Sequence, residues 1–347
     1  MTMRRIAVIA VFLVPFFLQC GMSQELFRIV VENKRGFIDT SGKVVIAPQF
    51  DHADGFSDGL ALVWKGMSSE VADVTLEDWG YIDPHGTMRL HPEFDDGRSF
   101  AEGLAAVRKN GIGTFTNSLW GFIDTSGKEI VGPTYYTVGN FSEGLAWVQT
   151  QRKMLFIYLT DEFGYIDRKG KMVIKPVFNQ AGDFSEGLAP VRVEQKRGYI
   201  DRSGALVIPP QFDAGFGFSE GFAPVRIGSK WGYIDKTGVL KMPAVYEDCR
   251  GFSGGYALVK ESGKWGFIDT TGTFVIKPDY ANASSFNGGV ASVSNGGRWG
   301  YIDTAGRFVI QPTFDEAGSF VRGFAGVTVE GKSGYINRNG KFIWGPR

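Results

Sequence analysis

Carboxylates recur through this sequence at fixed positions. Asp follows the phrase Gly-(Phe/Tyr)-Ile in eight of its nine copies, with Asn337 in the ninth. Two carboxylates that flank a glycosidic bond can hydrolyse it. A catalytic pair is normally unique in a chain, whereas this Asp occurs eight times, and Asp side chains often accept backbone N–H groups in turns. We therefore expect turn-forming aspartates, assign no catalytic residue, and predict that the protein is not an enzyme.

Histidine and cysteine are too few and too scattered for a metal centre. The only histidines are His52, His85 and His91, and the last two lie six residues apart across a predicted hairpin. No Cys or carboxylate stands near them at the spacing of a zinc site. Cys249 has no partner in a chain from which an export signal at positions 1–23 is removed, so no intrachain disulfide is expected. We predict neither a metal nor a cofactor.

Tryptophan offers a different chemistry, because exposed aromatic rings can stack on sugars or peptides. Five tryptophans share one position of a repeat, and we interpret them as structural, since aromatic side chains dominate core burial. These are Trp79, Trp120, Trp231, Trp265 and Trp299. Trp64 and Trp147 depart from the repeat beside insertions, and Phe156 and Tyr158 lie within one. These four residues are our candidate binding residues.

The elements that position these residues belong to a unit that is repeated along the chain. The phrase Gly-(Phe/Tyr)-Ile-(Asp/Asn) begins at nine glycines, with first spacings of 44, 41 and 43 residues and last five of 34: Gly36, Gly80, Gly121, Gly164, Gly198, Gly232, Gly266, Gly300 and Gly334. A fixed period of this length indicates a repeat architecture. Gly also stands six residues after each of these glycines, which predicts a hairpin turn with positive φ.

Each repeat predicts three strands. The aromatic-Ile strand is followed by a Val-Ile strand that ends near a Pro, because Pro cannot donate to a ladder. A third strand has alternating apolar residues, as in Gly187-Leu188-Ala189-Pro190-Val191. No segment shows a sustained helical period. We predict an all-β tandem array of about nine three-stranded antiparallel meanders, arranged as an open, solenoid-like array, with a closed propeller-like toroid as the alternative.

The predicted array fills residues 24–347. Its units begin near residues 26, 59, 103, 144, 187, 221, 255, 289 and 323. Three insertions of 10, 7 and 9 residues fall in the same hairpin of successive units, between Val63 and Trp79, Val107 and Trp120, and Val148 and Phe163. We expect them to project from one edge of the array.

Positions 1–23 have the pattern of an export signal. Arg4 and Arg5 precede an apolar run from Ile6 to Leu18, and small residues stand before Gln24. The alternative is a lipoprotein signal with a lipid anchor at Cys20, although Gln19 stands where such signals normally have a small residue. The run is too short to span a bilayer comfortably, and no other stretch approaches that length, so we predict no transmembrane span.

Charge excludes one class of partner. The chain has 37 basic and 37 acidic residues. It therefore has no basic field to attract nucleic acid, and we predict no nucleic-acid partner.

The phrases Lys230-Trp231-Gly232-Tyr233-Ile234-Asp235 and Phe184-Ser185-Glu186-Gly187-Leu188-Ala189 resemble the bacterial WG-repeat (KWG-repeat) family over residues 26–347. The resemblance implies a secreted or envelope-associated bacterial protein, in the periplasm, on the outer surface or outside the cell. Local departures replace the Trp by Arg35, Phe163, Arg197 and Ser333. The aromatic-Gly hairpin is also distantly similar to the repeats of Gram-positive cell-wall-binding proteins.

We expect an exported, non-enzymatic scaffold that binds protein or glycan partners, because repeats fill the mature chain and offer a long surface. The alternative is a cell-wall or polysaccharide binder with aromatic ladders. A glycan-active enzyme is a third hypothesis.

Overall fold

The structure is a computed structural model that describes residues 25–66, 79–109, 119–154 and 157–346. These residues form nine antiparallel β-sheets, which we call blades 1–9 in chain order. The all-β prediction is therefore confirmed. The predicted export signal, Cys20 and Phe156 lie outside the described residues.

Blade 1 has three strands and each of the others has four. The strands of blades 1–4 are β1 (Phe27–Val31), β2 (Lys34–Ile38) and β3 (Val44–Phe50); β4 (His52–Ala53), β5 (Ala61–Trp64), β6 (Trp79–Ile82) and β7 (Met88–Phe94); β8 (Asp96–Gly97), β9 (Leu104–Lys109), β10 (Leu119–Asp124) and β11 (Glu129–Tyr135); β12 (Thr137–Val138), β13 (Leu145–Met154), β14 (Ile157–Asp167) and β15 (Met172–Phe178).

The strands of blades 5–9 follow the same order: β16 (Gln180–Ala181), β17 (Leu188–Val193), β18 (Lys196–Asp201) and β19 (Leu206–Phe212); β20 (Ala214–Gly215), β21 (Phe222–Ile227), β22 (Lys230–Asp235) and β23 (Leu240–Tyr246); β24 (Asp248–Cys249), β25 (Tyr256–Glu261), β26 (Lys264–Asp269) and β27 (Phe274–Tyr280); β28 (Asn282–Ala283), β29 (Val290–Ser294), β30 (Trp299–Asp303) and β31 (Phe308–Phe314); β32 (Glu316–Ala317), β33 (Phe324–Val329), β34 (Lys332–Asn337) and β35 (Phe342–Trp344).

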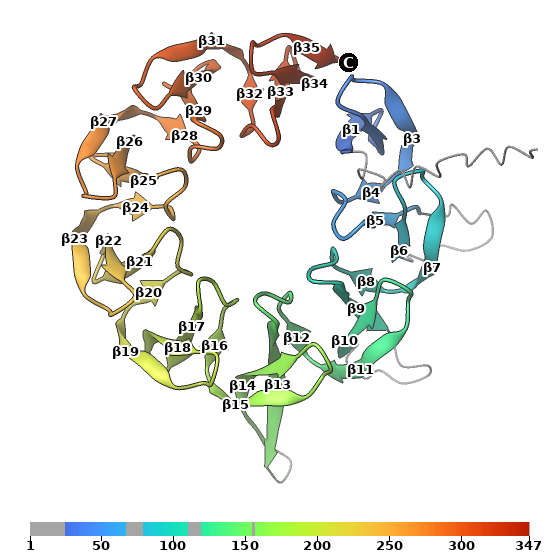
Figure 1. The fold of residues 1–347 in the computed structure, drawn as a ribbon, viewed down its shortest axis with the longest axis vertical. Coiled ribbons are helices and arrows are strands. Elements are labelled where there is room, and N and C mark those ends of the chain that lie inside the picture. The colour runs from blue at the N-terminus through green and yellow to red at the C-terminus, as the bar shows by residue number, and fades with distance from the viewer. Residues whose placement is uncertain (1–24, 67–78, 110–118, 155–156, 347) are drawn as a thin grey trace, which may run out of the picture.

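The blades form a closed ring, so the open array predicted from the sequence is wrong and the toroidal alternative holds. Figure 1 shows a β-propeller arrangement in which the two-residue strands face the centre and the seven-residue strands lie on the outside. Nine blades exceed the four to eight that are usual for propellers. The repeat number misled the prediction because it does not record how far each blade turns relative to the last.

Contacts between blades 1 and 9 close the ring. The Tyr335 hydroxyl donates to the Arg28 carbonyl at 2.7 Å. The rings of Phe27 and Phe324 lie edge to face, with centroids 5.0 Å apart. Arg322 forms an ion pair with Glu25, with 3.5 Å between Nε and Oε1. The two ends of the repeat array therefore pack against one another as neighbouring blades.

The prediction of three strands in each unit is also wrong, because a fourth strand forms in every blade except the first. One residue after the outer strand of a blade, the chain pairs with the next blade, as where His52 lies opposite Trp64 and Ala53 opposite Val63. A two-residue strand has too little hydrophobic pattern to be distinguished from a turn. This short strand follows the outer strand of one blade and pairs with the inner edge of the next, so it links the two blades.

The two repeated glycines have different physical roles. Gly204, six residues into its unit, has φ +87° and closes the turn, as the sequence predicted. At Gly198, which begins the unit, a β-carbon would lie 2.5 Å from the Ile208 carbonyl oxygen and 2.8 Å from the Pro210 nitrogen. There β19 bulges against β18, between the pairs Arg197–Phe212 and Tyr199–Ile208. This glycine is therefore required by close approach of the neighbouring backbone.

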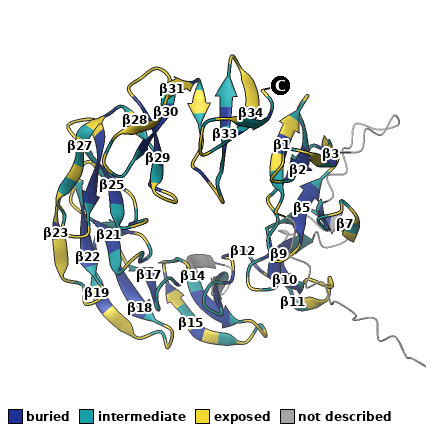
Figure 2. Cartoon of the chain, turned by 45° about the horizontal axis from the view of Figure 1, so that its top comes forward, coloured by how far each residue is buried: buried dark blue, intermediate teal, exposed yellow. Residues whose placement is uncertain are grey.

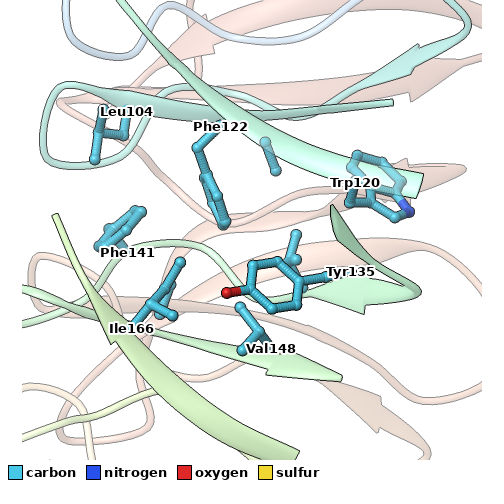
Figure 3. Packing of buried hydrophobic residues seen from close by; sticks show 10 residues of the cluster. Leu104, Trp120, Phe122, Tyr135, Phe141, Val148 and Ile166 are labelled. Carbon is cyan, nitrogen blue, oxygen red and sulfur yellow. The ribbon is translucent and has the colours of Figure 1, made fainter. Parts of the chain in front are cut away.

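The hydrophobic core lies mainly between blades. Figure 3 shows Phe122 of blade 3 near Phe141, Val148 and Ile166, which belong to the connection and strands of blade 4. Phe122 and Phe141 pack edge to face at 5.0 Å. Figure 2 shows the same distribution around the ring, with buried middle strands and more exposed outer strands. Each blade therefore buries its aromatic residues against its neighbour.

One hairpin departs from this regularity. Strands β13 and β14 have 10 and 11 residues, whereas β17 and β18 have 6 each. Their pairing continues to Met154 opposite Ile157. In Figure 1 this hairpin extends beyond the outline of the ring. None of the described segments forms a helix long and apolar enough to cross a bilayer.

Candidate functional site

The repeated aspartates bind the backbone of their own turns. Asp235 Oδ1 accepts N–H groups from Thr237 at 2.9 Å and Val239 at 3.1 Å. The Thr237 hydroxyl donates to the same oxygen at 2.6 Å, and this bond is the main reason that the pKa of Asp235 is lowered to about 2. Asn337 accepts the equivalent N–H groups of Asn339 and Lys341. A neutral amide serves equally at this position, which is the behaviour of a turn residue.

The Glu of the Ser-Glu-Gly phrase joins neighbouring blades on the inner side of the ring. Glu186 and Gly187 have φ values of +54° and +87°, so they form a type I′ turn. The Glu186 carboxylate accepts the N–H of Gly221 in the next blade at 3.0 Å. The Ser185 hydroxyl donates to the Phe218 carbonyl at 2.6 Å. These recurring groups therefore hold the ring together.

Cys249 is a buried residue of the blade 7 core. Burial raises the pKa of its thiol to about 12, although a hydrogen bond with Tyr233 acts in the opposite direction. A thiol needs a low pKa to act as a nucleophile at neutral pH. His52 lies instead on blade 2, where its Nε2 is 3.1 Å from Asp54 Oδ1. Among the described residues, His, Cys, Asp and Glu form no group suited to a metal ion.

The five repeat tryptophans lie at one position in their blades, and all are buried or half-buried. Trp120 and Trp265 are 8% and 9% exposed. Cationic side chains cover several of these rings. The Lys260 ammonium lies 5.7 Å from the Trp265 centroid, and the Arg226 guanidinium lies 5.9 Å from the Trp231 centroid. These rings therefore do not form a continuous exposed ladder.

Blade 2 carries an aromatic row in place of the cation–tryptophan pair. Trp64 on β5 pairs with His52 on β4 and with Trp79 on β6. The two indoles are stacked with centroids 6.2 Å apart, and the His52 ring lies 4.9 Å from that of Trp79. All three side chains are partly exposed, and the Trp64 indole N–H is buried without a hydrogen-bond partner in the described part of the chain. This row can present aromatic surface to a ligand.

Trp147 belongs to a second group, at the junction of blades 4 and 5. Its indole forms a hydrogen bond with Asp183 of blade 5. Burial raises the pKa of Asp183, while this bond and the charge of Arg98 oppose the shift. A β-carbon at Gly139 would lie 2.3 Å from Trp147 Nε1, so only glycine fits beside the indole. Trp147 therefore partly serves as an interblade contact.

Arg98 connects this group to blade 3. Its guanidinium donates to the Val138 carbonyl at 2.6 Å and lies 5.0 Å from the centroid of Trp120. Sequence reasoning missed both Arg98 and Asp183. Gly182 holds the position of Arg98 in another unit, and Ser99 holds the position of Asp183. Gly or Ser is often found at these positions, so a charged residue there was the available signal.

The structure does not place the three described candidate binding residues on one blade, and Phe156 lies outside the described residues. Trp64 lies on blade 2 and Trp147 on blade 4. The backbone of Tyr158 pairs with that of Lys153 in the long hairpin. The three described candidates therefore mark a sector, blades 2–4, which also contains the three insertions.

Several solved structures are similar to this chain. A crystal structure of a eukaryotic initiation factor matches with a TM-score of 0.60 at 12% identity, over 91% of this chain and 88% of that one. AztD from Citrobacter koseri in its apo form gives a TM-score of 0.44 at 12% identity, over 82% and 92% of the two chains. The β-propeller domain of the Trilobed protease from Pyrococcus furiosus gives 0.42 at 10% identity, over 73% and 94%. Of these three, only the first has a TM-score above 0.5, and at 12% identity its likeness concerns the fold alone.

Sequence comparison identifies the repeat. No curated protein matches the chain. The model of the WG containing repeat matches eight segments that cover most of the chain: residues 36–66, 79–111, 120–153, 163–196, 198–231, 231–265, 265–299 and 299–332. The resemblance found in the Lys-Trp-Gly-Tyr-Ile-Asp phrase is thus confirmed, and the chain belongs to the WG-repeat family.

Proposed function

We propose that the protein is a non-enzymatic binding ring, exported from the cytoplasm, that holds a partner protein against blades 2–4. The observation that carries the proposal is the β13–β14 hairpin, which extends past the ring outline, whereas the equivalent hairpins of blades 1 and 5–9 are short (Figure 1). A projecting hairpin presents unpaired edge N–H and C=O groups, and such edges are templates for pairing with another chain. Export rests on the sequence pattern of residues 4–23.

The rest of the ring suits a rigid support. The repeated Asp, Ser and Glu side chains are committed to turns and to contacts between blades, as in Asp235 and Glu186. The three insertions fall in blades 2–4. Binding residues are commonly found on loops that a rigid scaffold holds in place.

Shortening the hairpin tests this proposal. Deletion of residues 152–160, with Gln151→Asn and Asp161→Gly, leaves a two-residue type I′ turn of the length found between β17 and β18. We expect the ring to keep its thermal stability and to lose the partner captured from envelope extracts. As a matched control, Glu194→Asn with Gln195→Gly changes a short hairpin on blade 5 and should keep the partner. Equal capture by the shortened and unshortened proteins would refute the proposal.

A glycan ligand is the second candidate, and the Trp64–Trp79 pair favours it. Two indoles 6.2 Å apart beside a polar His52–Asp54 pair offer both a stacking surface and hydrogen-bonding groups. A glycan array should then show binding that falls at least tenfold in Trp64→Ala. The control is Trp265→Ala, because Trp265 is covered by Lys260 and Arg250. Array binding that is unchanged in Trp64→Ala would exclude this site.

A further inference from the structure

The junction between blades 9 and 1, which we call the seam, differs from the other eight junctions. Elsewhere a two-residue strand enters from the preceding blade and pairs with the inner edge of the next. Blade 1 consists of β1, β2 and β3 alone, so among the described residues the inner edge of β1 has no partner strand. Figure 1 shows the C-terminal end of blade 9 beside this blade without a connection between them.

A hydrogen-bond relay, present at the five other junctions where the repeat has Tyr after its first Gly, shows what the seam lacks. The Tyr199 hydroxyl donates to the Phe216 carbonyl at 2.9 Å, and the Phe216 N–H donates to the Pro224 carbonyl at 3.0 Å. The same relay runs from Tyr233 through Arg250 to Leu258. One extended residue of the connection therefore stands between the tyrosine and the strand.

At the seam this intermediate residue is missing from the relay. The Tyr335 hydroxyl donates directly to the carbonyl of Arg28, which holds the position of Pro224. At an occupied junction, the ring of Phe252 in the connection contacts Phe222 of the preceding blade. At the seam, Phe27 takes the place of this connection residue, because its ring contacts Phe324 of blade 9. The aromatic position is thus filled, while none of the described residues fills the position of the two-residue strand.

A cavity of about 220 Å³ lies at this position. Its lining includes Arg28, Ile29, Glu316, Ser333 and Trp344. Ser333 stands where the repeat places Trp, which leaves space beside the strand. Trp344 is 5% exposed, and its indole N–H has no hydrogen-bond partner within the described residues. A buried donor without a partner is costly, so a ligand that accepts this bond would be favoured.

The eight occupied junctions define the chemistry that fits. An aromatic residue is followed by a residue that is most often acidic. A variable residue and then a small one come next, as in Phe212-Asp213-Ala214-Gly215. Asp213 forms an ion pair with Lys196 at 2.6 Å, and Asp51 and Asp315 pair likewise with Lys34 and Arg298. Lys332 holds the corresponding position at the seam. An acidic residue is therefore favoured there.

We propose that the seam binds an extended peptide segment of another protein, with the pattern aromatic-Asp-x-Ala/Gly, as a fourth strand on blade 1. The peptide residue that follows Ala/Gly takes the place that Phe216 holds between blades 5 and 6. Its N–H donates to the Arg28 carbonyl and its carbonyl accepts the Tyr335 hydroxyl, which restores the relay. Its Asp pairs with Lys332, and its aromatic ring enters the space beside Ser333. Strand addition of this kind obtains affinity from main-chain hydrogen bonds and specificity from side-chain pockets.

A peptide copied from the chain tests the proposal. A fluorescent peptide with the sequence of residues 312–318 is titrated with a chain of residues 25–347, and binding is followed by fluorescence anisotropy. We expect saturable binding that weakens at least tenfold in Lys332→Ala and in a peptide with Lys in place of Asp. Lys264→Ala changes the equivalent lysine at an occupied junction and should leave binding unchanged. Absent binding, or equal binding by Lys332→Ala, would overturn the proposal.

Two further proteins complete the test. A chain extended after Arg347 by Phe-Asp-Glu-Ala-Gly should fill the seam from within, unfold at a higher temperature and no longer bind the peptide. An extended chain that still binds the peptide as before would contradict the assigned position. If the chain of residues 25–347 binds the peptide and the chain of residues 1–347 does not, the segment that precedes Glu25 occupies the seam, and the proposal of a partner peptide is wrong.

Discussion

At the scale of residues, the turn aspartates show how a repeated charged group can be structural. Asp235 and Asn337 accept the same two backbone N–H groups in their turns. The pKa of Asp235 is lowered to about 2, first by the Thr237 hydroxyl, and Lys241 also contributes. Asp201 and Asp269 have lowered pKa values for similar reasons. The charged form of these turns is therefore the stabilising one.

This charge predicts a pH-dependent difference between two variants. Because its pKa is lowered on folding, Asp235 contributes stability above about pH 4 that is lost as the pH falls to about 2. Asp235→Asn should keep the backbone hydrogen bonds and lower stability at pH 7 by less than about 1 kcal/mol, as is usual for exposed charges. Thermal unfolding from pH 7 to pH 2 should show the difference vanish at the acid end. A difference that does not change with pH would contradict this assignment.

Asp235→Ala is the matched comparison, because it removes the hydrogen bonds as well as the charge. Its effect should persist at pH 2, at about 1 kcal/mol for the lost hydrogen bonds. Loss of the effect at pH 2 would show that the charge alone matters.

Most residue roles were readable from repetition, and the exceptions arose from contacts between side chains of neighbouring units. The turn role of Asp followed from its recurrence eight times. The group of Arg98, Trp147 and Asp183 was not predicted, because its members lie in three different blades. A single sequence gives the position of each residue within its unit. It does not show which departures from the repeat meet across a junction.

At the scale of elements, the glycine that begins each unit fixes the bulge of the next strand. A β-carbon at Gly198 would overlap backbone atoms of Ile208 and Pro210, so the side chain has no room to move aside. Pro210 lies within the same bulged segment, where a missing N–H is tolerated. The glycine and the proline of the repeat thus describe one feature of the blade.

Gly198→Ala should therefore be strongly destabilising. We expect a loss of about 1–3 kcal/mol or more from the forced shift of β19, measured by chemical denaturation. Gly217→Ala is the control, because its β-carbon would lie 3.5 Å from that of Ser185, an ordinary contact, and its φ is not in the left-handed region. Similar stability losses in the two variants would show that close approach is not the reason for the glycine.

The elements themselves were largely predictable, apart from the shortest strand. The Gly-Tyr-Ile-Asp and Val-Ile patterns predicted the middle and outer strands of each blade. The inner strands, such as His52–Ala53, have two residues and no repeated apolar pattern. Their pairing depends on the position of the next blade, which is a property of the assembled ring.

At the scale of the whole molecule, closure of the ring determines what the protein can present. It places the long hairpin outside the outline of the ring and the connections between the two inner strands of the blades toward its centre, and it brings blades 9 and 1 together at the seam (Figure 1). The sequence predicted the number of units, but that number does not record how far each blade turns relative to the last, so the prediction of an open array was wrong. The ring closes because the faces of blades 1 and 9 are complementary. The Phe27 ring packs against those of Phe324 and Tyr335.

The distance between blades 1 and 9 tests closure most directly. Spin labels at Glu25→Cys and Arg322→Cys, in a Cys249→Ala background of residues 25–347, are measured by pulsed electron paramagnetic resonance. A closed ring joins these positions through an ion pair and predicts a single short distance of about 25 Å or less between the labels, given two flexible label arms. Nine sheets stacked about 10 Å apart in an open array would separate the ends by about 80 Å. A dominant distance near that larger value would contradict the ring, and with it the seam.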